Sequence, residues 1–407
     1  MKLLLNSISY QIYRLKVPLA PVIRAQAAIT LIAIVLTLTA LTGTAQAQAV
    51  RAQTVASGLQ NPWALAFLPE GRFLVTERDG SMRVVQPDGN VGAPIAGVPD
   101  VAANGQGGLL DVLLDGDFAR NRTLYFCYAE PAPGALTRGN STALARATLS
   151  ADNARLENVK VIFSQKPKFS SSAHFGCRIV ESRAPGANSP PDGKLFLTLG
   201  DRFSRRDDAQ TLDNHHGKIV RINKDGSVPA DNPFVGKAGA LPEIWSIGHR
   251  NLQGATLTPS GALWTHEHGP QGGDEINLPR PGANYGWPVI SYGENYGGGA
   301  INQGLRAQAG LEQPLHYWVP SIAPSGMAFL TSDKYGQAWQ GNLFVGSLKF
   351  AYLSRLELTD PYSGKVQKES KLLEGIGRVR DVRQGPDGLL YLLTDGSNGK
   401  LVRLLPG

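Results

Sequence analysis

The stretch PEGRFLVTERDGSMRVV at residues 69–85 combines two short apolar segments with the tight turns beside them. It reads Pro-x-Gly, then an apolar run that ends in Thr, then Asp-Gly, then a second apolar run. Glycine in such turns supplies the backbone conformations with positive φ that other residues adopt poorly. The stretch therefore predicts a β-hairpin.

The same pattern recurs along the chain. Further copies are PDGLLYLLTDGSNGKLVRL at 386–404, DGKLFLTLGD at 192–201 with GKIVRI at 217–222 after an insertion, and PSGALWT at 259–265. Hairpins repeated over a whole chain are typical of radial folds, in which each blade buries its faces against its neighbours. At ~50–60 residues per blade, residues 50–407 predict one all-β domain, a six-bladed β-propeller. A pair of β-sandwiches is the alternative, since it also gives short strands and turns.

Residues 1–47 have the pattern of a secretory signal peptide. Residues 1–24 hold four basic residues and no acidic one, and the apolar run AAITLIAIVLTLTAL follows at 27–41. Ala45-Gln46-Ala47 then provides a small-x-small cleavage site. The apolar run is shorter than the ~20 residues that a bilayer span needs. We therefore expect a cleaved leader and a periplasmic or secreted protein, with an uncleaved N-terminal anchor as the alternative.

The charge balance argues against a nucleic-acid partner. The chain holds 40 Lys and Arg and 33 Asp and Glu, and without the four basic residues of the leader the balance is 36 to 33, or +3. No run of five basic residues occurs, whereas nucleic-acid binding usually needs a basic stripe.

Two cysteines, Cys127 and Cys177, are too few for a disulfide scaffold and lack the Cys-x-x-Cys spacing of zinc or haem sites. In an oxidising compartment they would pair, and otherwise they would be two buried thiols. The sequence leaves both alternatives open.

Several polar side chains lie where a predicted strand ends or a loop begins, which are the positions that a propeller gathers around one mouth of its channel. They are Gln106 in NGQGGLLDV, His174 in HFGCRI, Asp201 in LGDRF, Arg250, Asn251 and Gln253 in GHRNLQG, Lys349 in GSLKF, and Arg378 and Arg380 in RVRDV. Arg378 and Arg380 are two residues apart, so in a strand they share a face. Their guanidinium groups would repel each other unless an anion lies between them.

The segment HEHGPQGGDEIN at 266–277 offers two interpretations as a metal site. His266 and His268 could share a strand face and bind zinc, but no third ligand is evident. Calcium is favoured, because Gly-Pro followed by Gly-Gly exposes backbone carbonyl oxygens, which hard cations accept as ligands. The pair His215-His216 would point to opposite faces of a strand, so we expect structural roles for both.

These motifs resemble those of the soluble glucose and aldose sugar dehydrogenases, which use pyrroloquinoline quinone (PQQ). The resemblance runs from NPWALAFLPEGRFLVTER at 61–78 to LLYLLTDGSNGKLVRL at 389–404, nearly the whole chain after the leader. One such motif would be a weak signal, but nine in the family's order are highly specific. They are NGQGGLLDV, HFGCRI, LGDRF, GHRNLQG, EHGPQGGDEIN, NYGWP, WVPSIAPSG, GSLKF and RVRDV. The resemblance implies a six-bladed propeller.

The resemblance also implies roles for single residues. His174 would be the general base that takes the proton of the C1 hydroxyl of an aldose, while hydride passes from C1 to the quinone carbon C5 of PQQ. Asp201 would orient His174, and Gln106, Asp201 and Trp318 would lie around the sugar. Arg250 would stabilise the negative charge that develops on the quinone oxygen. The residues implied to hold PQQ are Gln106, Arg250, Asn251, Gln253, Lys349, Arg378 and Arg380, and the backbone carbonyls of Gly269 and Pro270 would bind Ca²⁺.

The charges suit this assignment. PQQ carries three carboxylates, and the four cationic residues Arg250, Lys349, Arg378 and Arg380 would face them. Ca²⁺ would act as a Lewis acid, and histidine is a suitable proton acceptor near neutral pH. No cytochrome motif is fused to the chain, so electrons would leave to a separate acceptor, a quinone or a cytochrome.

Two other functions and the oligomeric state stay open. A calcium-dependent propeller lactonase or esterase would use the histidine without a quinone, but it gives Lys349 and the Arg378/Arg380 pair no task. A non-catalytic propeller that binds carbohydrate is the second alternative. Both a monomer and a homodimer are compatible with the sequence.

Overall fold

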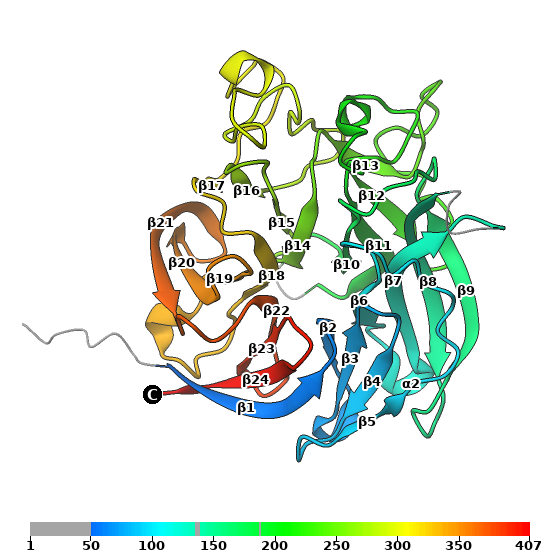
Figure 1. The fold of residues 1–407 in the computed structure, drawn as a ribbon, viewed down its shortest axis with the longest axis vertical. Helices are drawn as coiled ribbons and strands as arrows, with labels where there is room; N and C mark the ends of the chain where they lie inside the picture. Colours follow the sequence, from blue (N-terminus) through cyan, green and yellow to red (C-terminus); the bar gives the residue numbers. More distant parts are fainter. Residues whose placement is uncertain (1–49, 135–138, 187–188) are drawn as a thin grey trace, which may run out of the picture. The chain divides into compact units, whose positions relative to one another are not determined.

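The computed structural model describes residues 50–134, 139–186 and 189–407, and the predicted leader at 1–47 lies outside them. The chain from Val50 to Gly407 forms one compact unit. In it, 24 strands form six four-stranded antiparallel sheets (Figure 1). No helix among the described residues is both long and apolar enough to span a membrane.

The first three blades follow one another along the chain, each as an antiparallel meander. The first blade consists of β2 (Pro62–Phe67), β3 (Phe73–Glu77), β4 (Met82–Val85) and β5 (Val91–Pro94). The second consists of β6 (Leu109–Leu114), β7 (Thr123–Pro131), β8 (Asn140–Leu149) and β9 (Leu156–Ser164). The third consists of β10 (Gly176–Arg183), β11 (Pro191–Leu199), β12 (Lys218–Asn223) and β13 (Ile244–Ile247).

The last three blades complete the ring. The fourth consists of β14 (Leu252–Leu257), β15 (Leu263–Glu267), β16 (Asp274–Asn277) and β17 (His316–Trp318). The fifth consists of β18 (Pro324–Phe329), β19 (Leu343–Ser347), β20 (Tyr352–Asp360) and β21 (Ser363–Leu372). The sixth consists of β22 (Val379–Gln384), β23 (Leu390–Thr394), β24 (Gly399–Pro406) and, as its outer strand, β1 (Val50–Leu59).

Two features close the six blades into a ring. Strand β1 pairs with β24, with Val50 opposite Pro406 and Thr54 opposite Val402, so the first strand of the chain belongs to the last blade. The first strands of the blades, β2, β6, β10, β14, β18 and β22, each contact the next, and β22 contacts β2. The predicted six-bladed propeller is therefore confirmed.

Short helices lie only in the connections among the described residues. They are η1 (Pro69–Gly71), α2 (Phe118–Asn121), η3 (Arg206–Gln210), η4 (Asn302–Gly304) and η5 (Gln337–Trp339).

The repeated motif builds the second and third strands of a blade, and its threonine has a structural task. The pairing of β2 with β3 shifts in register between Pro62 and Ala64, and the Ala64 N–H donates to Thr76 Oγ1 at 3.0 Å. In the third blade, the Arg178 N–H likewise donates to Thr198 Oγ1 at 2.9 Å. The threonine thus accepts a hydrogen bond that the bulged inner strand cannot make within the sheet.

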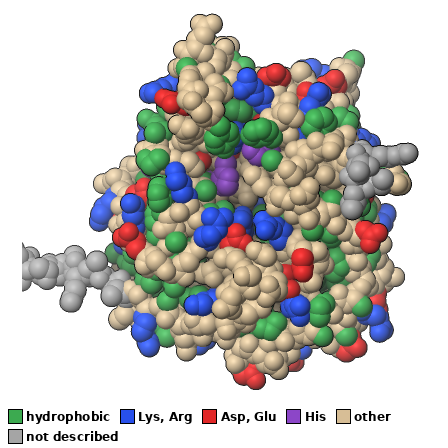
Figure 2. Space-filling view, in the orientation of Figure 1, with side chains coloured by type: hydrophobic (Ala, Val, Ile, Leu, Met, Phe, Trp, Pro, Cys, Tyr) green, Lys and Arg blue, Asp and Glu red, His purple; other side chains and the backbone are tan. Residues whose placement is uncertain are grey.

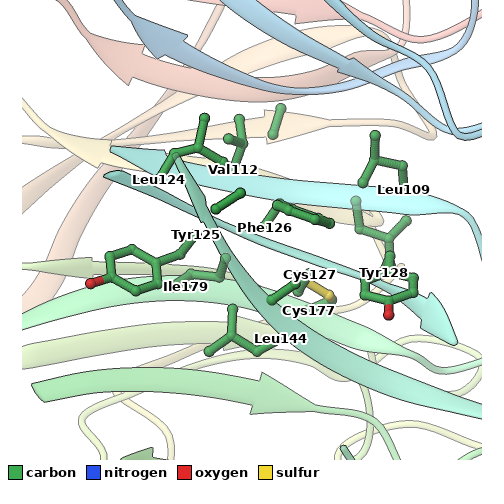
Figure 3. Close-up of a cluster of buried hydrophobic side chains, with 14 of the residues drawn as sticks. Leu109, Val112, Leu124, Tyr125, Phe126, Cys127, Tyr128, Leu144, Cys177 and Ile179 are labelled. Carbon is green, nitrogen blue, oxygen red and sulfur yellow. A yellow bond between two sulfur atoms is a disulfide. The ribbon is translucent and has the colours of Figure 1, made fainter. Parts of the chain in front are cut away.

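A large hydrophobic core spans the first three blades, and a disulfide crosses it (Figure 3). Cys127 in β7 and Cys177 in β10 are fully buried and bonded to each other, so the bond joins the second blade to the third. Phe126 and Tyr128 flank Cys127 along β7 and belong to the same core. Of the two alternatives for the cysteines, the structure shows the paired one.

A buried ion-pair network ties the inner strands together at the centre of the ring. Arg178 Nη1 in β10 lies 3.0 Å from Asp111 Oδ1 in β6 and 3.1 Å from Asp381 Oδ1 in β22. Arg383, also in β22, lies 2.6 Å from Asp111 and 2.9 Å from Asp381. The Leu65 N–H of β2 donates to Asp381 Oδ2 at 3.0 Å. Four blades therefore meet through two carboxylates and two guanidinium groups.

We expect Arg178→Met to destabilise the protein by about 3–5 kcal/mol, because it leaves Asp111 and Asp381 buried with half of their counter-charge. The free energy of unfolding from urea titration measures this loss. Arg155→Met is the matched control, since Arg155 is mostly exposed and Glu157 is its one ion-pair partner among the described residues, and it should cost less than about 1 kcal/mol. Equal small losses in both variants would contradict the structural importance of the network.

Candidate active site

A cavity of about 410 Å³ opens at the centre of the ring. Each blade contributes to its lining, directly or through the loop that leads into the blade: Trp63, Gln106, Gly176, Gln253, Lys349 and Arg380, in blade order. Figure 2 shows histidine side chains in a hollow at the centre of this face, with Lys and Arg side chains gathered beside them. The cavity is thus assembled from residues that are far apart in the sequence.

The lining carries an excess of positive charge. Arg78, Lys349, Arg378 and Arg380 contribute four cations and Asp395 one anion, which leaves a net +3. Arg380 Nε is buried without a hydrogen-bond partner among the described residues. Burial lowers the pKa of Arg380, but the ordinary pKa of an arginine is so high that the side chain remains a cation near neutral pH. Such a cavity favours a ligand with several carboxylates.

Asp395 is the anion that the spacing of Arg378 and Arg380 requires. Its Oδ2 lies 3.4 Å from Arg378 Nη2 and 3.3 Å from Arg380 Nη2. Burial alone would raise the pKa of Asp395, but the two arginines outweigh that effect and lower it. One carboxylate therefore holds both guanidinium groups on one side of the cavity.

His174 and Asp201 form a buried pair beside the cavity. His174 Nδ1 lies 2.6 Å from Asp201 Oδ1, and Asp201 is completely buried. Asp201 also accepts hydrogen bonds from Trp287 Nε1 at 2.7 Å and from the Phe203 N–H at 2.8 Å. These donors fix the carboxylate, and the carboxylate fixes the imidazole so that Nε2 is the nitrogen left to accept a proton.

The backbone at His174 is strained. Its φ is 52°, a left-handed conformation that costs a residue with a Cβ about 1–2 kcal/mol. Gln106 Oε1 accepts the His174 N–H at 2.8 Å. A Cβ on Gly200 would lie 2.2 Å from the His174 carbonyl oxygen, so glycine is required at that position of LGDRF. Sequence-distant partners therefore hold His174 in place.

Burial controls the protonation state of the histidines here. Burial lowers the pKa of His174, and Asp201 only partly opposes it, so the value lies below the ordinary 6.5. Burial also lowers the pKa of His268, which lines the cavity, to about 3. Both side chains are therefore neutral near pH 7, and His174 is able to take up a proton.

Arg250 links the His174–Asp201 pair to the loop between β15 and β16. Its Nη1 donates to the carbonyl oxygens of His268 at 3.0 Å and of Gly269 at 2.5 Å. The guanidinium lies 5.2 Å from the centre of the Trp287 ring, and the Arg250 carbonyl accepts the Asp201 N–H at 2.8 Å. The chain thus presents consecutive carbonyl oxygens to a cationic group.

Asn251 and Gln253 form part of the cavity wall next to His174. Asn251 Oδ1 accepts the Gly176 N–H at 3.2 Å and a hydrogen bond from Gln253 Nε2 at 3.1 Å. Gln253 also accepts a hydrogen bond from Arg178 Nε through its backbone carbonyl, so the wall rests directly on the central ion-pair network.

The structure separates Trp318 from the other predicted site residues. Its ring is buried in a core between the fourth and fifth blades, and its Nε1 donates to Glu369 Oε2 at 3.1 Å. Side chains alternate along a strand, so Tyr317 and Val319 point the opposite way and line a second cavity. Trp318 therefore does not line the central cavity, and its role near the sugar stays a prediction.

The histidines that first suggested zinc have no third metal-binding side chain grouped with them among the described residues. Neither nitrogen of His266 has a hydrogen-bond partner among the described residues, and His268 Nε2 bonds to the Pro324 carbonyl. In the described part of the chain, no three His, Cys, Asp or Glu side chains are grouped to hold a metal. His215 and His216 have separate partners, Glu243 and Asp208.

Several residues of the site were not among the predicted ones, and Arg78, Asp395, Trp287 and His268 are the polar or hydrogen-bonding ones. Arg78 follows β3 and Asp395 follows β23, and both strands are copies of the repeated motif. The position directly after this strand could therefore have identified both residues from the sequence. Trp287 lies in the NYGWP motif. The motif supported the family resemblance, but it did not indicate that Trp287 bonds to Asp201. The sequence suggested His268 as a zinc ligand, whereas in the structure it is a neutral side chain that lines the cavity.

Comparison with known proteins identifies the family. A model described as glucose/sorbosone dehydrogenase matches residues 59–403. The Escherichia coli K12 protein named aldose sugar dehydrogenase YliI is 44% identical over 363 residues, which cover 88% of this chain and 93% of that protein.

Solved structures agree with this match. The apo-form of the soluble aldose sugar dehydrogenase of Escherichia coli has a TM-score of 0.81 and 43% identity, over 88% of this chain and 100% of that one. The PQQ-bound form of the aldose sugar dehydrogenase of Streptomyces coelicolor has a TM-score of 0.70 and 27% identity, over 88% of this chain and 98% of that one. The chain belongs to the glucose/sorbosone dehydrogenase family.

Proposed function

We propose that the protein is a PQQ-dependent aldose sugar dehydrogenase that oxidises the C1 hydroxyl of aldoses to lactones. One observation carries the proposal: a cavity with a net charge of +3 is lined by Gln106, which bonds to the backbone of His174 in the buried His174–Asp201 pair. The relatives named aldose sugar dehydrogenase, one of them solved with PQQ, support the same activity. Electrons then leave to a separate acceptor.

The cavity residues fit PQQ. Three carboxylates match the net charge of the lining, and the buried Arg380 Nε is a donor without a partner among the described residues. Lys349, Arg378 and Arg380, with Arg78, would hold the carboxylates, and the side-chain amides of Gln106, Asn251 and Gln253 would contact the ring system. PQQ, when bound, supplies an ortho-quinone that accepts hydride from the sugar.

His174 removes the proton of the C1 hydroxyl at Nε2. The Asp201 carboxylate holds Nδ1–H and stabilises the imidazolium that results. Gln106 fixes the histidine backbone, so the base does not turn away when its charge changes. Arg250, next to the pair, stabilises negative charge that develops in the cavity.

The loop at Gly269 and Pro270 would hold Ca²⁺. The carbonyls of His268 and Gly269 already converge on the Arg250 guanidinium, so this loop directs its oxygens at a positive charge. Hard cations accept such oxygens as ligands. Bound there, Ca²⁺ would act as a Lewis acid beside the quinone.

Reconstitution with PQQ and Ca²⁺ tests the function. We expect dye reduction with aldoses only when both are added, and loss of activity on removal of Ca²⁺ by a chelator. A matched pair separates the roles: His174→Ala should lower kcat at least ~10²-fold with PQQ affinity retained, while Arg378→Ala should weaken PQQ binding in a titration of the apo-protein. Lactone hydrolysis without PQQ, or PQQ binding without turnover of any aldose, would contradict the proposal.

The pH dependence follows from the pKa of His174. The base acts only when neutral, so kcat/KM should fall as pH drops below the depressed pKa and stay level from pH ~6.5 to ~8. Asp201 raises this pKa, so Asp201→Asn should move the acid limb to lower pH and reduce kcat. An acid limb that stays in place in this variant would show that another group controls it.

We also propose that the protein is exported. The leader pattern of residues 1–47 supports this, and so does the Cys127–Cys177 disulfide, since such bonds persist in oxidising compartments. Mass spectrometry of the expressed protein should find a mature N-terminus directly after Ala47. A chain that keeps residues 1–47 would contradict cleavage.

A further inference from the structure

Arg202, the residue directly after Asp201, is a buried cation that the proposed chemistry does not use. Its side chain is completely buried, and no carboxylate of the described residues forms an ion pair with it, since Asp201 pairs with His174 instead. Its Nε also lacks a hydrogen-bond partner in the described part of the chain. A buried charge without a counter-charge destabilises a fold, which points to a task other than stability.

The segment that carries His174 encloses the Arg202 guanidinium. Nη2 donates to the Ser171 carbonyl at 2.8 Å, and Nη1 donates to the His174 carbonyl at 3.5 Å. The guanidinium also lies over the Phe175 ring, with Cζ 3.6 Å from the ring centre. Two backbone oxygens and one aromatic face of residues 171–175 therefore surround a single cation.

Further hydrogen bonds attach this assembly to the second blade. Arg202 Nη2 donates to the side-chain oxygen of Asn140 at the start of β8, and Thr142 Oγ1, also in β8, donates to the Phe175 carbonyl at 2.7 Å. In the other direction, Ser171 Oγ donates to the Arg202 carbonyl at 3.2 Å. Arg202 thus links the 171–175 segment to β8 and to the β11–β12 loop at once.

The backbone is left-handed on both sides of this contact. The φ angles are 52° at His174, 61° at Arg202 and 67° at Phe203. Residues with a Cβ keep such a conformation only where the surrounding structure holds them in it. The bonds from Arg202 to the Ser171 and His174 carbonyls are part of what holds His174 there.

The charge of Arg202 also acts on the His174 imidazole. The charged and titratable groups that face His174 are Asp201, Arg202, Arg250 and His268. Burial is the main cause of the low pKa of His174, Asp201 opposes it, and the two arginines add to it. Burial lowers the pKa of Arg202 itself to about 9, so this side chain is still a cation near neutral pH.

We propose that Arg202 is a positioning residue for His174, because its guanidinium holds the 171–175 segment in the geometry that sets the base against the substrate. Arg202 is fully buried and acts through His174, not on the sugar. Its task differs from that of Asp201, which bonds to the imidazole, whereas Arg202 bonds to the backbone of the same residue. The inference rests on the proposed function, since it takes His174 as the base.

The first measurement is the pH titration of His174 in the protein without PQQ, with Ca²⁺ present, by NMR of histidine labelled at Cε1. The spectrum of His174→Ala assigns the signal. Arg202→Met removes the charge and should move the titration to higher pH, because one of the two arginines that lower the pKa of His174 is lost. Arg206→Met is the matched control, since Arg206 lies half-exposed in η3 of the same connection, and it should leave the titration in place.

The second measurement is turnover of the protein reconstituted with PQQ and Ca²⁺. Arg202→Met should lower kcat by about ten- to a hundredfold with PQQ affinity unchanged, because a small displacement of the base removes much of the rate. The acid limb of kcat/KM should move to higher pH together with the NMR titration. Arg202→Lys keeps a cation but not the planar fork that bonds to both carbonyls, so it should restore the position of the limb and only part of kcat.

A His174 titration that stays in place in Arg202→Met, or a kcat in that variant equal to the wild-type value, would overturn the inference. If Arg202→Met does not fold, Arg202→Lys decides: a reduced kcat with an unmoved titration supports the inference, and a full kcat overturns it. If the titration moves as expected but the loaded wild type oxidises no aldose, the proposed function fails while the link between Arg202 and His174 stands.

Discussion

The central ion-pair network of Asp111, Arg178, Asp381 and Arg383 is the constraint on which the rest of this propeller depends. Inner strands of a propeller converge on an axis, where their side chains compete for little space. Here alternating charges fill that space and connect four blades through buried carboxylates. The Gln253 carbonyl accepts a hydrogen bond from Arg178. The cavity wall formed by Asn251 and Gln253 is therefore connected to the same network. The same ion-pair network therefore holds the blades together and positions the cavity wall.

The site concentrates features that would destabilise an ordinary core. Arg378 and Arg380 lie side by side with only Asp395 between them, and Arg380 Nε lacks a partner among the described residues. His174 holds a left-handed backbone. Such strain is usual where a site is prepared for a ligand that later supplies the missing interactions. A polyanion in the cavity would complete the charge balance that the protein alone leaves open.

The neighbourhood of His174 is fixed from several blades at once. Gln106 comes from the loop before the second blade, Asp201 from the β11–β12 loop of the third, and Trp287 from the long β16–β17 connection of the fourth. The same connection supplies Tyr292 and Tyr296 to the lining of the second cavity, in the fourth blade. One loop thus supports the proposed base through Trp287 and also lines a second cavity, as long connections with a functional task often do.

The sequence by itself determined the hairpin repeat, the six blades and six residues of the cavity lining, because turn chemistry and strand alternation are local and the nine motifs are specific in their order. It also predicted an anion between Arg378 and Arg380, because two like charges on the same face of a strand repel each other in any fold. Only the tertiary structure decided that this anion is Asp395, that Cys127 pairs with Cys177, that Arg78 joins the cavity, and that Trp318 turns into the core. Those outcomes depend on which strands become neighbours around the axis and which face of each strand looks inward, and no local pattern encodes either.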